Sequence, residues 1–327
     1  MKKKMTLLAL EKDFSGKTRE IIALANSLVD LYNVEIFFLN SSNDSIIINS
    51  KIKVSIYNPQ VLECRKFYTD LFKDSDVVIS TDEEFSKYVI KYAKCKTILW
   101  AHKERNFVKD KLLSKYDLIV VPNKYLKNHY LGCNDNVIII NDAIELPKDK
   151  KLASGDNLIF IGRLTKDKKL ENLIDIFAKV QKEIKTNLII IGVGEERKNL
   201  EDYLKKSKIP NVYFKGLLNK SEMENELLES SLYVTCAEKD TSNLSMLEAM
   251  SYGVPVVAFS DILDDTSFIV DDINGYLIEN RDEDIMYERI KTVLTDREKR
   301  ENLSLCAKEK SLEFDIYSLK IEWIKIL

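Results

Sequence analysis

The chain has 327 residues, more than one compact core usually holds, so two domains are the first expectation. Hydrophobic residues make up 45% and charged residues 31%, as in ordinary globular proteins, and a net charge of −3 argues against a nucleic-acid partner. No apolar run approaches the ~20 residues that span a bilayer, so any membrane contact is expected to be peripheral.

The five cysteines and the basic first residues of the chain predict the cellular compartment in which the protein works. The cysteine count is odd and no CxxC pair occurs, which indicates reduced thiols in a cytoplasm and neither disulfides nor a zinc site. The start, MKKKMTLLALEKDFSG, is basic, but its apolar run is too short for a signal peptide. Residues 1–150 hold 24 Lys and Arg against 20 Asp and Glu. This weak excess of positive charge is consistent with contact to an anionic surface, or with scattered, solvated lysines.

Short apolar runs alternate with amphipathic segments through the first half of the chain. The runs predict strands of a covered parallel sheet, at 5–10, 34–39, 76–80, 96–100 and 117–122. Helical spacing at 17–32 and 83–94 fills the intervals, and this alternation predicts a doubly wound α/β domain.

The second half repeats the same alternation after a polar, lysine-rich join at 141–157, which contains Pro147 and Gly155. Strands are expected at 157–162, 187–192 and 211–216, with helices at 170–184 and 195–208. The sequence therefore predicts two doubly wound, Rossmann-like domains, residues 1–146 and 147–313.

Two short motifs suggest chemistry that their context does not support. Gly16-Lys17-Thr18 has the ending of a P-loop, but Glu11 stands where that motif needs its first glycine. Asp74-Ser75-Asp76 resembles a metal-binding DxD motif, but it precedes a strand and does not follow one. We interpret the first as a tight turn before a helix and the second as a helix-to-strand turn.

Residues that follow the strands of such sheets are the first candidates for ligand contacts, because ligands bind beyond the carboxyl ends of the strands. Arg163 and Lys168 lie together in the loop IGRLTKDKKL, ahead of a helix. An Arg fork, a Lys charge and the N–H groups of a helix start suit a diphosphate. A solvated lysine-rich loop remains the alternative at this point.

The stretch DTSNLSMLEAMSYGVPVVAFSD, residues 240–261, places two acids across a loop and a helix. The three residues up to Asn243 favour a helix start, and their backbone N–H groups would face the same crevice. Glu248, one turn inside the helix, could bind a vicinal diol such as a ribose, and Asp240 a second hydroxylated group. A capping acid and a surface glutamate remain the alternative.

Together these segments resemble the retaining GT-B glycosyltransferases of family 4, also called glycosyl transferases group 1. The resemblance runs without gaps over FIGRLTKDKKLENLIDIFAKV, LIIIGVGEERKNLEDYL, NVYFKGLL, LYVTCAEKDTSNLSMLEAMSYGVPVVAF and VDDINGYLIEN. It covers the C-terminal half closely and the N-terminal half in pattern only. It implies a GT-B fold of two Rossmann-like domains that face each other across a cleft.

The resemblance assigns roles to residues of the C-terminal half. Arg163 and Lys168 fall where the family holds the donor diphosphate, and Leu244 supplies a backbone N–H near the phosphate. Glu248 falls where the second acid of the E-x7-E motif binds the ribose, and Asp240 where the first acid contacts the transferred sugar. The remaining position is Gly216, where the chain passes the nucleotide base.

In the N-terminal half the resemblance is carried by two loops and the last helix. His102, in ILWAHKE, resembles the histidine that the family places near the donor sugar, although a half-buried structural histidine remains the alternative. The Gly16 loop would line the interdomain cleft. The segment 314–327 is expected to cross back onto the first domain, with Phe314, Tyr317, Trp323 and Ile324 as its core-facing stripe.

Several positions depart from the family pattern. The first acid is Asp240 and not Glu, and Lys169 stands where Gly is usual. These changes concern the sugar pocket and the acceptor side, so nucleotide binding is the firmer expectation and sugar identity the weaker one.

The sequence thus predicts a retaining glycosyltransferase. It would move a hexose or N-acetylhexosamine from a nucleotide diphosphate sugar, UDP-linked, to a hydroxyl of a saccharide or lipid-linked acceptor, in the synthesis of cell-surface polysaccharide or glycoconjugate. It would need no metal or other cofactor, and would work in the cytoplasm or peripherally at the inner membrane face. The alternative is a catalytically weak GT-B homologue that acts as a partner or chaperone of an active enzyme.

Overall fold

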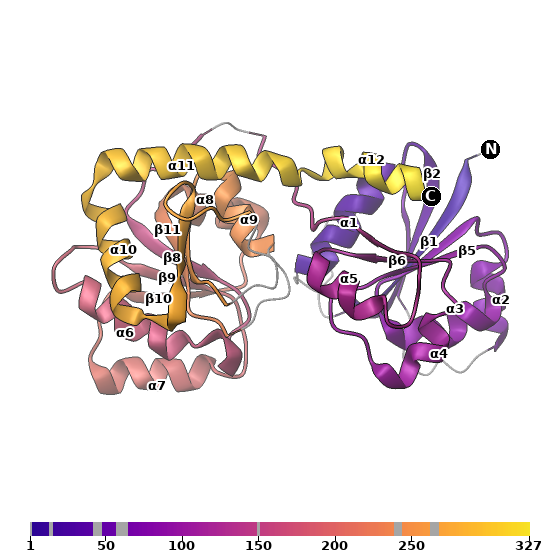
Figure 1. Ribbon diagram of the computed structural model, residues 1–327, viewed down its shortest axis with the longest axis horizontal. Coiled ribbons are helices and arrows are strands. Elements are labelled where there is room, and N and C mark those ends of the chain that lie inside the picture. The colour runs from indigo at the N-terminus through magenta and orange to yellow at the C-terminus, as the bar shows by residue number, and fades with distance from the viewer. Residues whose placement is uncertain are drawn as a thin grey trace. The chain divides into compact units, whose positions relative to one another are not determined.

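The computed structural model describes residues 2–12, 16–41, 48–56, 65–148, 151–238, 244–261 and 268–327. The chain forms two compact units, the first of residues 1–145 and 315–327 and the second of residues 146–314 (Figure 1). These boundaries lie one residue from those expected from the sequence, and the last helix, α12 (Ile316–Ile326), belongs to unit 1.

Unit 1 contains a seven-stranded sheet in the order β3-β2-β1-β4-β5-β6-β7, and every neighbouring pair is parallel. The five predicted strands are present, and two short edge strands that the apolar pattern did not reveal complete the sheet. The strands are β1 (Lys3–Lys12), β2 (Tyr32–Ser41), β3 (Lys53–Ile56), β4 (Val77–Ser80), β5 (Lys96–Trp100), β6 (Leu118–Val121) and β7 (Val137–Ile139).

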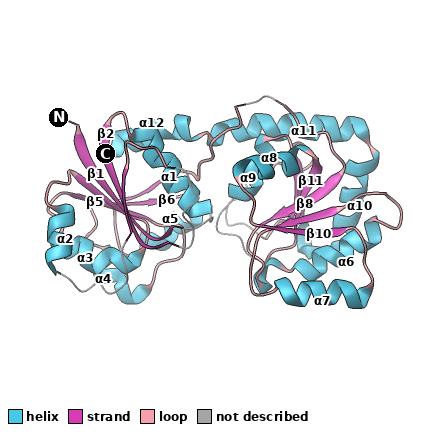
Figure 2. Ribbon diagram, turned by 180° about the vertical axis from the view of Figure 1, so that it is seen from behind, coloured by secondary structure: helices cyan, strands magenta, loops and turns pink. Residues whose placement is uncertain are grey.

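Helices cover both faces of this sheet, which is why its central strands are apolar on both sides (Figures 1 and 2). On one face lie α1 (Gly16–Leu28) and α12, which contact each other. On the other lie α2 (Arg65–Phe72), α3 (Ser86–Tyr92), α4 (Asp110–Leu113) and α5 (Lys124–Tyr130). Two 3-10 turns, η2 (Glu83–Phe85) and η3 (Phe107–Lys109), precede α3 and α4.

The buried stripe of α12 differs from the predicted one. Trp323 is buried as expected, but Tyr317 and Ile324 are 60% and 39% exposed, so their assignment to the core was wrong. Ile316 takes the second buried position, and its N–H donates to the Ile144 carbonyl at 2.9 Å. Phe314 is buried as well, but it precedes the helix and belongs to unit 2, where its ring packs against Phe268.

Unit 2 contains a six-stranded parallel sheet in the order β10-β9-β8-β11-β12-β13. All three strands that the sequence predicted after residue 150 are present. The strands are β8 (Asn157–Ile161), β9 (Leu188–Ile191), β10 (Val212–Gly216), β11 (Ser230–Thr235), β12 (Val256–Phe259) and β13 (Gly275–Ile278).

The helices of unit 2 again form two layers. In Figure 1, α6 (Leu170–Val180) and α7 (Arg197–Ser207) lie below the sheet, and α8 (Lys220–Leu228), α9 (Leu244–Ser251) and α11 (Arg297–Ser311) lie above it. α10 (Glu283–Thr295) contacts both α6 and α11. Short 3-10 turns are η4 (Lys166–Lys168), η5 (Glu279–Arg281) and η6 (Leu312–Phe314).

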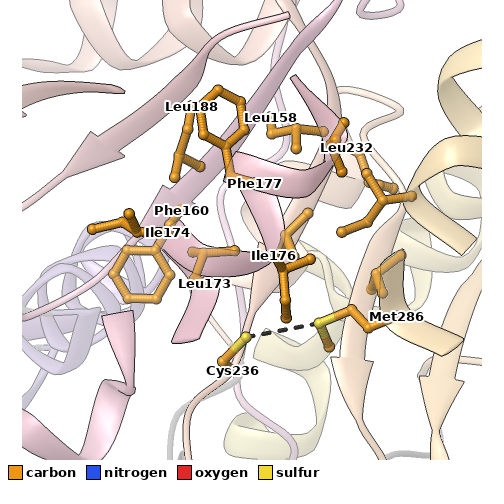
Figure 3. Packing of buried hydrophobic residues seen from close by; sticks show 14 of the residues in the cluster. Leu158, Phe160, Leu173, Ile174, Ile176, Phe177, Leu188, Leu232, Cys236 and Met286 are labelled. Carbon is orange, nitrogen blue, oxygen red and sulfur yellow. Dashed lines mark hydrogen bonds between the residues drawn. The ribbon is translucent and has the colours of Figure 1, made fainter. Parts of the chain in front are cut away.

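The core of unit 2 forms where α6 and α10 meet the sheet (Figure 3). Phe160 of β8 and Phe177 of α6 are fully buried there, and the Cys236 thiol lies 3.7 Å from the Met286 sulfur. Burial raises the pKa of the Cys236 thiol to about 12, so it behaves as a small apolar group. None of the described helices combines the length and apolar character that crossing a bilayer requires.

Candidate active site

The strand order of unit 2 reverses between β8 and β11. From β8 the chain continues through α6 to β9 on one side, while β11 lies on the other side. Loops that leave such a point in opposite directions open a crevice at the carboxyl ends of the strands, where ligands of open α/β sheets bind. The loop after β8 carries Arg163 and Lys168, and the loop after β11 leads into α9, so the structure places the predicted diphosphate residues at this point.

The loop after β8 is basic, and some of its side chains contact one another. Arg163 is exposed and makes no hydrogen bond or ion pair with other described residues. Lys168 ends η4 with its side chain only 9% exposed, and its Nζ lies 3.8 Å from Asp167. Burial acts to raise the pKa of Asp167. The Thr165 side chain and the charges of Lys168 and Arg163 outweigh it and hold this pKa below its usual range. The loop therefore presents one exposed guanidinium and one largely buried ammonium.

Lys169 adopts a left-handed backbone conformation, with φ of 47°, at the position where the family pattern has glycine. Glycine reaches this region at little cost, whereas a lysine does not. Its Nζ lies 2.8 Å from Glu238, and the Glu238 N–H donates to the Asp167 carbonyl at 2.7 Å. These contacts tie the basic loop to the residue that directly precedes residues 239–243.

The first turn of α9 is tied to the end of β8. Leu244 begins the helix and is buried. The Ser245 hydroxyl lies 3.1 Å from the Tyr233 hydroxyl, which donates to the Ile161 carbonyl at 3.0 Å. The helix start, whose N–H groups suit an anion, is thereby held beside the basic loop. Glu248 follows one turn later and is half-buried.

Asp240 and Asn243 lie outside the described residues, so the structure leaves their predicted roles untouched. The chain that leads toward them is held by Arg281, which the sequence did not single out. Its guanidinium donates to the Cys236 carbonyl at 2.6 Å and to Asp261 at 2.9 Å, and it stacks on the Phe259 ring at 4.4 Å. Arg281 comes from η5, and only the tertiary structure brings it here.

Glycines allow the loops after β8, β9 and β10 to approach closely. A Cβ on Gly192 would lie 1.9 Å from the Gly162 carbonyl oxygen, and the φ of Gly192 is +136°. The Gly192 N–H donates to the carbonyl of Gly216, which has a φ of +70° at the end of β10. Gly216, where the nucleotide base is expected, therefore lies next to the loops after β8 and β9, close to the reversal of strand order.

Unit 1 has its own reversal of strand order, between β1 and β4. Gly16 begins α1 after β1, and Lys17 forms a 2.6 Å ion pair with Asp82, which follows β4. The second Asp82 oxygen accepts from the Leu10 N–H and the Thr81 hydroxyl at 3.3 and 3.0 Å. Lys17 is thus paired with a carboxylate of unit 1. The sequence motif did not predict this pair.

His102 follows β5 and lies in a buried cluster. Its Nε2 is 3.0 Å from Glu20 of α1 and 4.0 Å from Asp142, which follows β7. The Ala143 N–H donates to the second Glu20 oxygen at 3.0 Å, and the imidazole packs on Trp100 with ring centroids 5.0 Å apart. These residue types also bind metals, but 3.0 Å is a hydrogen-bond length, and we interpret the cluster as hydrogen-bonded.

Burial controls the charge of this cluster. It raises the pKa of Glu20 to about 8, although the Ala143 N–H and the Lys17 charge oppose the shift. It lowers the pKa of His102 to about 4, with Lys17 acting in the same direction and the Asp142 and Asp82 charges opposing. At neutral pH, Glu20 is therefore a carboxylic acid and His102 a neutral imidazole.

A shallow cavity of about 370 Å³ lies elsewhere on unit 2. Asn157 at the start of β8 and Asn187 before β9 line it, together with Tyr213 and residues of α8. These are the amino ends of the strands, whereas Arg163 follows the carboxyl end of β8. The cavity is therefore separate from the candidate site.

The model of the family "Glycosyl transferases group 1" matches residues 142–310, more than half of the chain. The chain belongs to this family. The glycosyltransferase has the GT-B fold, with two Rossmann-like domains built on parallel sheets. Its family match covers the whole loop after β8, the start of α9 and Arg281.

Relatives of this glycosyltransferase extend over different shares of its length. An uncharacterised glycosyltransferase of Haemophilus influenzae is 26% identical over 95% of the chain and 96% of that protein. The N-acetyl-alpha-D-glucosaminyl L-malate synthase of Bacillus anthracis is 28% identical over 63% of the chain and 54% of that enzyme.

A solved structure shares the fold along the whole chain. The Anabaena protein HepE, determined in complex with UDP and glucose, superposes with a TM-score of 0.85 at 14% identity. The match covers 99% of this chain and 99% of HepE. At this identity the likeness establishes the fold of the glycosyltransferase and no substrate.

Proposed function

We propose that this glycosyltransferase moves a hexose or N-acetylhexosamine from a UDP-linked donor to a hydroxyl of a saccharide or lipid-linked acceptor, with retained configuration. The observation that carries the proposal is the joint position of Arg163, Lys168 and the start of α9 at the reversal between β8 and β11. Two cations and a helix N-terminus at one crevice suit the diphosphate of such a donor.

The same groups would assist the reaction. As the bond between sugar and phosphate breaks, negative charge builds on the leaving diphosphate. Arg163, Lys168 and the N–H groups near Leu244 would stabilise that charge through preorganised donors. With these charges in place, the reaction needs no metal ion. Retention would follow if the leaving phosphate oxygen accepts the acceptor proton on the same face of the sugar.

The comparisons support the donor class. HepE has the same fold and was determined with UDP and glucose, and the Bacillus anthracis relative is named for an N-acetylglucosaminyl product. The relatives reported above are glycosyltransferases or a glycosyl synthase, which gives the partner-protein alternative no support. A ribose role for Glu248 agrees with its half-buried place one turn into α9.

Thermal unfolding of the whole protein in EDTA tests the proposal. UDP, GDP, ADP, CMP and TDP are compared, followed by the matching nucleotide sugars. A ligand at 100 times its Kd should add about 2.7 kcal/mol to the free energy of unfolding. We expect a shift with UDP in the absence of metal.

A matched pair of variants in one loop identifies the binding residues. Arg163→Ala should reduce the UDP shift, whereas Lys166→Ala, which removes an exposed cation of the same loop, should leave it unchanged. No shift with any nucleotide, or equal losses in both variants, would contradict a diphosphate site at the end of β8.

A further inference from the structure

The buried contact between Glu20 and His102 is formed by groups far apart in the sequence. Glu20 lies on α1 with its side chain 1% exposed, and the His102 ring beyond β5 is 11% exposed. Both lie at the carboxyl edge of the sheet of unit 1, the edge at which ligands of such sheets bind. A buried carboxyl group at this edge is costly unless its hydrogen bonds are made, so its two partners define its role.

The two oxygens of Glu20 have different partners. One accepts the Ala143 N–H at 3.0 Å, and an amide N–H can only donate. The other faces His102 Nε2 at 3.0 Å, where either atom could hold the proton. Because burial disfavours charge on both groups, the proton belongs on this second oxygen, and Nε2 accepts it.

We propose that Glu20 is a positioning residue: as a carboxylic acid it donates to His102 Nε2, and so fixes the ring and its tautomer for the sugar-transfer reaction. The inference rests on the proposed function and on the family resemblance that puts His102 near the donor sugar. Four further features surround the ring. Lys17 of α1 and Asp82 after β4 face it as an ion pair, Asp142 lies 4.0 Å from Nε2, and the Trp100 indole supports one side.

Glu20→Gln and Glu20→Ala distinguish this role from a merely structural one. The glutamine NH2 can donate to Nε2 while its oxygen accepts from Ala143, so it reproduces the protonated acid at every pH. We expect Glu20→Gln to keep kcat within about threefold at pH 7, and Glu20→Ala to lose about 10²-fold, as for a misplaced group.

The pH profile gives the sharper readout. Wild-type kcat should fall on the alkaline side with a midpoint near pH 8, as Glu20 ionises, and Glu20→Gln should lack that fall. Glu35→Gln is the control, since Glu35 is also buried in unit 1 but pairs with Lys4 and Lys53. It should retain the wild-type profile.

The UDP shift in thermal unfolding, measured on the same variants, separates this inference from the proposed function. It reports on unit 2 and should persist in all of them, so its absence from the wild type would refute the donor site alone. With the shift present, the positioning role is refuted if Glu20→Gln is as inactive as Glu20→Ala, if it keeps the alkaline fall, or if EDTA abolishes wild-type activity.

Discussion

At the scale of single residues, Arg163 is distinguished from the other cations of its loop by position. It is the first side chain beyond Gly162 at the end of β8, and it is exposed without a partner among the described residues. Arg163→Ala should lower kcat by roughly 10²–10³, the loss expected for one preorganised donor to a developing anion. Steady-state kinetics against Lys166→Ala provides the comparison. A loss below about threefold in Arg163→Ala would remove this residue from the site.

Glu20 is the residue whose environment changes its chemistry most clearly. The pKa of Glu20 in the folded protein is about 8, against an ordinary value of 4.5. Between these two pH values the folded state therefore binds more protons than the unfolded state. The contribution of Glu20 to the free energy of unfolding should therefore fall as pH rises toward 8. His102 is neutral in the folded state over this range, but its ordinary pKa of 6.5 means that it still titrates in the unfolded chain near pH 6.5. This adds a slope of opposite sign there, which is common to the wild type and to a variant of Glu20 and cancels when the two are compared.

Glu20→Gln should abolish this contribution, because an amide does not titrate. We expect the stability of this variant, relative to wild type, to increase steadily from pH 6.5 to 8 in urea unfolding. A pH-independent difference would mean that Glu20 titrates alike in the folded and unfolded chains.

At the scale of elements, the packing of the loops after β8 and β9 depends on Gly192. A side chain there would meet the Gly162 carbonyl and would force an L residue into a positive φ. Gly192→Ala should destabilise the protein by ~2 kcal/mol or more and weaken the UDP shift, because the loop after β8 must move. Val193→Ala is the control, since Val193 is 49% exposed. Equal stability of the two variants would disprove the close approach.

At the scale of the whole molecule, the chain leaves unit 1 near residue 145 and returns to it near residue 315. α12 completes the core of unit 1, where Trp323 meets Trp100 with ring centroids 4.7 Å apart. Trp323→Ala should cost about 3–5 kcal/mol, as for other buried aromatic truncations. Ile321→Ala, at a 58% exposed position of the same helix, should cost under ~0.5 kcal/mol. Calorimetry would contradict this placement if both variants melted alike.

The sequence by itself determined the alternation of strands and helices, the two-domain division and the location of the basic loop. These follow from local properties: apolar runs predict buried parallel strands, helical spacing predicts the crossovers, and the residues after a strand lie at its carboxyl end. The same reasoning missed β3 and β7, which are only four and three residues long and lie at the two edges of the sheet.

The tertiary structure alone decided which side chains meet. Glu20 and His102 are 82 positions apart, Arg281 reaches Cys236 from 45 positions away, and Lys17 finds Asp82 across 65. No local pattern contains such pairs, since they depend on the order of strands in the sheet. The face of α12 was misjudged for a related reason: its burial is set by where α1 and the sheet lie, and not by the spacing of its own apolar residues.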